Sequence, residues 1–133
     1  MSISHKTSAP LPEPTRAELE ILQVLWQHGP STVRYVNDEL NKQRAVNYTS
    51  TLKLMQIMVD KGLLQRDESS MKHVYRVAEA EAKTKDALLD KFIDTMYQGS
   101  AGKLMMQLLG NKKTSEAELK AIKEMIRKME QEK

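Results

Sequence analysis

Residues 45–62 constrain the fold of this chain more than any other segment. Four residues recur at helical spacing and form one apolar stripe: Thr51, Leu54, Met55 and Met58. Another face carries mostly short polar and basic side chains: Thr49, Ser50, Lys53, Gln56 and Ile57. A helix that buries one face and offers such side chains from its first turns has what a major-groove DNA reader needs. The same pattern also fits a surface helix whose polar side is simply solvated.

Two further helices are predicted ahead of this segment. Thr15 and Glu18 match a capping box, and the Gly-Pro pair at 29–30 ends the apolar helix that follows. The Ser-Thr pair at 31–32 leaves room for a very short strand or for a helix cap. Three apolar residues then mark a second helix: Val33, Val36 and Leu40. Helices this close in sequence, joined by tight turns, favour a helix-turn-helix arrangement.

After Gly62 the apolar period changes to the alternation of strands. Segments 63–70 and 73–77 flank a Ser-Ser-Met-Lys tip and predict a β-hairpin. Three helices followed by a hairpin is the order of a winged helix. We therefore expect a mainly α fold, with a winged helix-turn-helix head at 15–79 that carries a small β-hairpin wing. Three prolines predict a flexible N-terminal arm at 1–14.

Residues 80–133 predict a tail of three helices. A break at 97–100, a stop at Gly110 and a second capping box from Ser115 to Glu118 separate them. Each helix carries an apolar stripe: Leu88, Phe92 and Met96; Leu104, Met105 and Leu108; Leu119, Ile122 and Ile126. No second domain in the chain covers these stripes, so we expect a homodimer that buries them from about Glu81 onward.

Composition narrows the class of function. The net charge is +3 and the pI about 9.1, so nucleic-acid binding has to come from a local face. The absence of cysteine excludes disulfides, zinc thiolates and thiol sensing. Three separated histidines do not predict a metal site. No nucleophile-and-base pattern or phosphate loop is present, so we expect neither an enzyme nor a cofactor. Without a signal peptide or an apolar run of about 20 residues, a cytoplasmic protein without direct membrane insertion is expected.

Several segments, in order and spacing, make the chain resemble the penicillinase-repressor family of bacterial winged-helix transcriptional regulators. The segments that carry the resemblance are 15–26, 32–36, 48–50, 60–64, 97–109 and 115–119. The resemblance implies a homodimeric repressor whose winged-helix head binds an inverted repeat in double-stranded DNA, and whose helical tail interleaves with that of its partner.

The resemblance also suggests how the repressor is released. In the antibiotic-responsive branch of the family, a membrane sensor protease signals and the repressor is cleaved inside the tail. The Asn-Phe cleavage motif of that branch falls at Gln107 and Leu108 here, which departs from the motif. In the copper-responsive branch, C-terminal cysteines bind metal, and this chain has none. Operator release by cleavage is therefore an expectation, and release by metal is not.

The candidate DNA contacts lie at three places. Thr49, Ser50 and Lys53, with Gln56, are the base or phosphate contacts of the third helix; the alternative is that Thr49 only caps it. Tyr48 either contacts a phosphate or packs as a hydrophobic staple. The remaining phosphate candidates are Arg34, Arg44, Lys72, His73 and Arg76. Two other functions stay open: a winged helix that docks proteins without DNA, supported by Leu52 and Ile57, and a repressor that holds a small effector in its dimer cleft.

Overall fold

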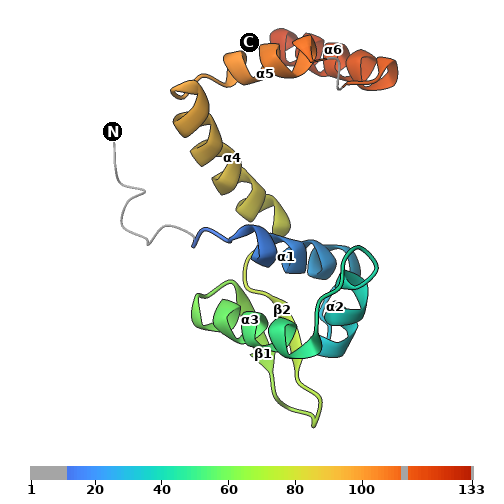
Figure 1. Cartoon of the computed structure of the whole chain (residues 1–133). Coiled ribbons are helices and arrows are strands. Elements are labelled where there is room, and N and C mark those ends of the chain that lie inside the picture. The colour runs from blue at the N-terminus through green and yellow to red at the C-terminus, as the bar shows by residue number, and fades with distance from the viewer. Residues whose placement is uncertain (1–11, 112–113, 133) are drawn as a thin grey trace. The chain divides into compact units, whose positions relative to one another are not determined.

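The computed structural model describes residues 12–111 and 114–132, and the chain divides into two compact units between Leu88 and Leu89. The first unit holds α1 (Arg16–His28), α2 (Val33–Leu40), α3 (Tyr48–Asp60), β1 (Leu64–Asp67) and β2 (Val74–Val77) (Figure 1). Helix α4 (Glu81–Tyr97) runs across the division, and α5 (Ala101–Gly110) and α6 (Glu116–Gln131) follow. The expected mainly α fold with a small two-stranded wing is confirmed.

Local capping explains where the helices of the head begin. The Thr15 hydroxyl accepts from the Glu18 N–H at 3.2 Å, and the Glu18 carboxylate accepts from the Thr15 N–H at 2.8 Å, which confirms the capping box. Thr32 caps α2. Asn47, rather than Thr49, caps α3, because its side chain accepts from the Ser50 N–H at 2.7 Å. Thr49 therefore lies inside the helix, and the capping alternative for it is wrong.

The core of the head is formed by one side of each element. Its buried apolar residues are Ile21, Leu22, Leu25, Val33, Val36, Met55, Met58, Leu63, Leu64 and Tyr75. Buried apolar side chains each contribute roughly 1.5–3 kcal/mol to folding. Pro14 is also buried, so residues 12–14 belong to the head, while the rest of the predicted arm lies outside the described residues.

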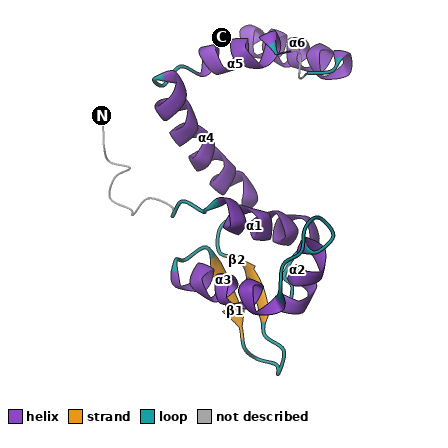
Figure 2. Ribbon diagram, viewed as in Figure 1, coloured by secondary structure: helices purple, strands orange, loops and turns teal. Residues whose placement is uncertain are grey.

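The wing is a short antiparallel hairpin (Figure 2). Leu64 pairs with Val77, and Asp67 pairs with Val74. Two strands alone are marginal in water. Here Tyr75 is buried against the helices, and it exchanges backbone hydrogen bonds of 2.9 and 2.8 Å with Ser31. Both alternatives for the pair at 31–32 therefore hold: Ser31 forms a β-bridge and Thr32 caps α2.

The tail helices have clear local boundaries and no buried core. Gln98 and Gly99 take positive φ angles of 49° and 81°, which end helix α4. Ser100 caps α5, and Ser115 and Glu118 form the second predicted capping box at the start of α6. In the part of the chain that the structure describes, no residue of α4, α5 or α6 is buried. These helices therefore lack the packing that ordinarily stabilises helices of this length.

Candidate nucleic-acid interface

A cleft in the head brings four of the predicted DNA contacts together. Its volume is about 480 Å³, and its walls are the first turns of α2 and α3 and the tip of the wing. Among the lining residues are Arg34 from α2, Tyr48 from α3, and Lys72 and His73 from the wing. Residues that lie up to 39 positions apart in the sequence thus face one cavity, as an extended phosphate backbone requires.

The electrostatics of this cleft favour an anion. None of the described residues that line it is acidic. Thr32 at the start of α2 and Tyr48 at the start of α3 both line the cleft, so the positive ends of two helix dipoles lie beside it. The net charge of +3 is thus less informative than its local arrangement.

The Tyr48 ring has a basic neighbour that the sequence did not suggest, and both alternatives considered for Tyr48 stay predictions. The guanidinium carbon of Arg34 lies 4.7 Å from the centroid of the Tyr48 ring, a cation–π contact. The Tyr48 side chain remains 38% exposed. Arg34 and Tyr48 therefore lie side by side in the lining of the cleft, and Tyr48 remains partly accessible to solvent.

Helix α3 presents the predicted polar face beside this cleft. Its core side is formed by Thr51, Met55 and Met58, which are all buried, and by the half-buried Leu54. The four candidate contacts Thr49, Ser50, Lys53 and Gln56 are all exposed. The helical spacing therefore predicted correctly which side of α3 faces solvent.

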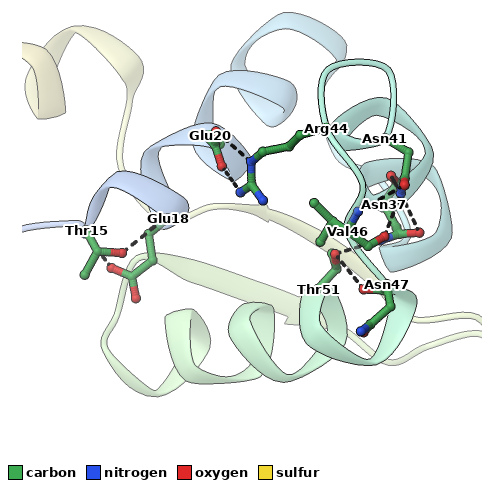
Figure 3. A network of polar contacts seen from close by, with 9 residues as sticks. All are labelled: Thr15, Glu18, Glu20, Asn37, Asn41, Arg44, Val46, Asn47 and Thr51. Carbon is green, nitrogen blue, oxygen red and sulfur yellow. Dashed lines mark hydrogen bonds and ion pairs between the residues drawn. The ribbon is translucent and has the colours of Figure 1, made fainter.

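Two of the predicted phosphate contacts are engaged with other side chains. Arg44 forms an ion pair with Glu20 of α1, and this hydrogen-bonded pair lowers the pKa of Glu20 (Figure 3). The Nε atom of Arg76 donates to the Gln65 side chain across the wing at 3.1 Å. Both side chains stay exposed, Arg76 on the wing and Arg44 beside its partner Glu20 of α1.

A second cleft, between α1 and α2, has the opposite character. It measures about 180 Å³ and is lined by two carboxylates, Glu20 and Glu39, as well as by His28 and Arg44. Glu39 accepts from Lys42 at 2.7 Å, and this hydrogen bond lowers its pKa. The carboxylates of this cleft are therefore paired with basic side chains of the head, and the cleft is less suited to an anion than the one lined by Arg34, Lys72 and His73.

The sequence did not single out Met71 at the wing tip. Its side chain is 100% exposed and lines the same cleft as Lys72 and His73. The sequence did contain a signal for Met71, which is an apolar side chain in an otherwise polar turn. A side chain that is not buried in the head does not stabilise the fold by being apolar. Such a residue is suited to pack against deoxyribose or a base edge.

The described residues add two observations on other kinds of site. No helix among them is long and apolar enough to cross a membrane. They contain no group of three or more His, Cys, Asp or Glu side chains that could hold a metal ion. His5 lies outside the described residues.

Comparisons with known proteins support the fold of this chain and show the family to which it belongs. The structure is similar to that of a MarR family protein from Bacillus stearothermophilus, with a TM-score of 0.53 and 20% identity, over 91% of this chain and 76% of that one. This likeness supports the winged-helix fold. The penicillinase repressor family model matches residues 14–128, and the chain belongs to that family.

A curated relative supports the same assignment. The penicillinase repressor of Bacillus licheniformis is 22% identical over 116 residues, which cover 87% of this chain and 91% of the relative. The family is one of transcriptional repressors rather than enzymes, which confirms two expectations from the sequence: the family itself and the absence of catalytic activity.

Proposed function

We propose that this repressor acts as a homodimer that occupies an inverted-repeat operator in double-stranded DNA. In each head, α3 lies in the major groove and presents Thr49, Ser50, Lys53 and Gln56 to the bases. The observation that carries the proposal is the cleft in which Arg34, Tyr48, Lys72 and His73 meet beside that helix. A phosphate backbone that passes through this cleft fixes the register of α3 on the duplex.

The tail supports the dimeric part of the proposal. It carries many exposed apolar side chains: Leu89, Phe92, Met96, Met105, Met106, Leu108, Leu109, Met125, Ile126 and Met129. The other predicted dimer residues, Leu88, Leu104, Leu119 and Ile122, are half-buried. So many exposed large apolar side chains in one short segment are unusual for a monomer and typical of obligate interfaces. A second copy, with the same stripes, is the partner that covers it.

Selection of bound sequences from random DNA tests operator recognition directly. The full-length protein should enrich an inverted repeat with half-sites about one helical turn apart. Lys53→Ala should then cost roughly 1–3 kcal/mol if Lys53 reads a base, and should relax the preference at one position. If Lys53 contacts phosphate, binding should weaken evenly and the salt slope should fall by about one unit.

Lys120→Ala is the matched control for this measurement. It removes the same charge from an exposed position on α6, far in sequence from the interface. Operator affinity and salt slope should stay those of the parent protein. If Lys53→Ala and Ser50→Ala both bind like the parent at every salt concentration, the placement of α3 in the groove is wrong.

Sedimentation at micromolar concentration tests the dimer. Ile122→Asp places a charge in the apolar stripe of α6 and should shift the protein toward monomer. Lys120→Asp, on the opposite side of the same helix by its periodicity, should leave the dimer intact. A parent protein that sediments as a monomer would contradict the proposal.

Release from DNA is proposed to act through the tail, with a membrane sensor protease as the partner. Gln107 and Leu108, the matched cleavage position, lie in the second half of α5, and Leu108 is 44% exposed. The Gln107 carbonyl accepts from the Asn111 N–H, so cleavage requires this last turn to open first. Tracking the mass of the protein in its native cells under cell-wall antibiotic stress tests this. An intact chain that still leaves its operator would eliminate cleavage.

One observation keeps protein docking as a second candidate. Ile57 is 40% exposed on α3. Leu52, which the sequence also offered for docking, is instead half-buried and packs against the core. Of the two apolar residues that the sequence offered for docking through α3, only Ile57 is exposed. Failure to select any DNA sequence would favour the protein-docking function.

A further inference from the structure

Side-chain amides hold the second half of the loop between α2 and α3. Residues 41–47 join the two helices and contain neither glycine nor proline. Backbone hydrogen bonds to α2 continue as far as Arg44, whose N–H donates to the Leu40 carbonyl at 3.2 Å. Figure 3 shows that the side chains of Asn37 and Asn41 converge on Val46, just before α3 begins.

Asn41 pairs with both backbone polar groups of Val46. Its Nδ2 atom donates to the Val46 carbonyl at 2.8 Å, and its Oδ1 atom accepts from the Val46 N–H at 3.1 Å. Nδ2 also lies 2.7 Å from the Asn37 carbonyl. The side chain thus acts like one residue of a neighbouring strand and closes the loop on the last turn of α2.

Asn37 links this loop to the recognition helix itself. It is 6% exposed, and its Nδ2 atom donates to the Val46 carbonyl at 3.1 Å and to the Thr51 hydroxyl at 2.8 Å. Thr51 is 1% exposed and lies in the first turn and a half of α3. Both N–H groups of Asn37 are therefore used, one on the loop and one on α3.

The N–H donors of the Asn37 and Asn41 side chains already have hydrogen-bond partners inside the head. Val46 O accepts from both side chains, and the Asn41 amide faces acceptors on two sides. Neither residue has a spare donor for DNA. In the middle of the loop, the Arg44–Glu20 ion pair ties it to α1 (Figure 3). The loop is thus attached to all three helices of the head.

We infer that Asn37 and Asn41 are positioning residues for operator recognition, and that they fix the start of α3 so that its short side chains meet the bases in one orientation. This inference rests on the proposed DNA-binding function. Thr49, Ser50 and Lys53 lie within seven residues of Val46, so a loose loop moves these contacts directly. Contacts with bases depend on placement to about 0.5 Å, whereas attraction to phosphates depends mainly on charge.

Asn41→Ala is the test variant, because Asn41 is exposed and its replacement leaves no large cavity. Gln43→Ala is the matched control: a neutral, exposed amide two residues along the same loop. Thr51→Val is a second variant of nearly equal volume that removes the hydroxyl accepting from Asn37. Urea unfolding followed by the fluorescence of Trp26, the single tryptophan, first verifies that each variant is folded at the assay temperature.

Hydrogen exchange provides the first readout and needs no DNA. Asn41→Ala should raise amide exchange over residues 44–51 by about tenfold, the worth of one ordinary hydrogen bond. Amides in the middle of α1 should exchange as in the parent. Unchanged exchange at residues 44–51 would overturn the inference, because the loop would then keep its structure without the Asn41 side chain.

Binding provides the second readout, with the operator obtained by selection and a scrambled duplex of equal length. Asn41→Ala and Thr51→Val should each weaken operator binding by about tenfold and leave binding to the scrambled duplex unchanged. Gln43→Ala should change neither. Equal weakening on both duplexes would indicate a merely structural role and would overturn the inference. A parent protein that selects no sequence refutes the proposed function instead, and the exchange comparison still decides whether Asn41 holds the loop.

Discussion

Replacing Glu18 by glutamine tests how the first helix is joined to the recognition helix. The Glu18 side chain is 2% exposed, and its Oε1 atom accepts from the Lys61 ammonium, just after α3, at 2.7 Å. Glutamine keeps the capping box, since it also serves at that position, and removes only the charge. The experiment therefore separates the ion pair from the cap that Glu18 also forms with Thr15.

The structure sets the size of the expected loss. Breaking a fully buried ion pair costs roughly 3–5 kcal/mol. Lys61 remains 33% exposed, so after Glu18→Gln its ammonium is rehydrated, and we expect a loss of about 1–2 kcal/mol. Lys61→Met is the more damaging change, because it leaves the buried carboxylate with only its bond to Thr15.

The loss should depend on pH in one direction. Burial opposes ionisation of Glu18, but the hydrogen bonds from Lys61 and from the Thr15 N–H outweigh it and hold its pKa below the ordinary value of 4.5. A lowered pKa in the folded state means that the ionised group stabilises the fold above pH 4.5, and that this stability disappears as the pH falls through the lowered value. The parent and Glu18→Gln should therefore differ at pH 7 and converge in acid.

Urea unfolding at fixed protein concentration, followed by Trp26 fluorescence, measures both effects in the head. Glu20→Gln is the control on the same helix, because its partner Arg44 is half exposed and the pair is screened by water. Its loss should be smaller than that of Glu18→Gln. Equal stability of the parent and Glu18→Gln at pH 7, or a difference that persists unchanged below pH 4, would refute the reasoning.

Three further changes test other parts of the structure. Gly62→Ala should cost about 1 kcal/mol in urea unfolding because Gly62 has φ of +84°, whereas Gly102→Ala, inside α5, should not destabilise; equal effects would contradict this. Met71→Ala should weaken operator binding without changing the Trp26 transition, since Met71 is fully exposed; unaltered binding would remove it from the interface. Ser115→Ala should cost α6 about 1 kcal/mol, seen as helix content lost earlier on heating, and Ser70→Ala, at an exposed position outside the helices, is its control.

The sequence predicted what local rules determine. Both capping boxes, the glycine stop at Gly29 and the break at 97–100 are found where the sequence placed them. The buried and exposed sides of α3 also follow from helical spacing alone. These features depend on residues three or four positions apart, so a single sequence contains all the information they need.

Contacts between distant segments were not predictable in the same way. The partner of Arg44 lies 24 residues away, and Lys61 lies 43 residues from Glu18. Both charged residues look solvated in the sequence. The cap of α3 was missed for a related reason: Asn47 and Thr49 are both good capping residues, and the choice depends on where the Asn37 and Asn41 amides anchor Val46.

The two units divide the work of the proposed repressor in a way that their packing explains. The head closes its own core around Ile21, Met55 and Tyr75, so the exposed face of α3 does not need a partner to keep its structure. The tail buries no described residue of its own, so in the proposed dimer it depends on the second copy for its packing. In the proposed dimer, linking two heads gains about 10²–10⁴ in affinity over one. A signal that acts only on the tail can therefore empty the operator without unfolding either head.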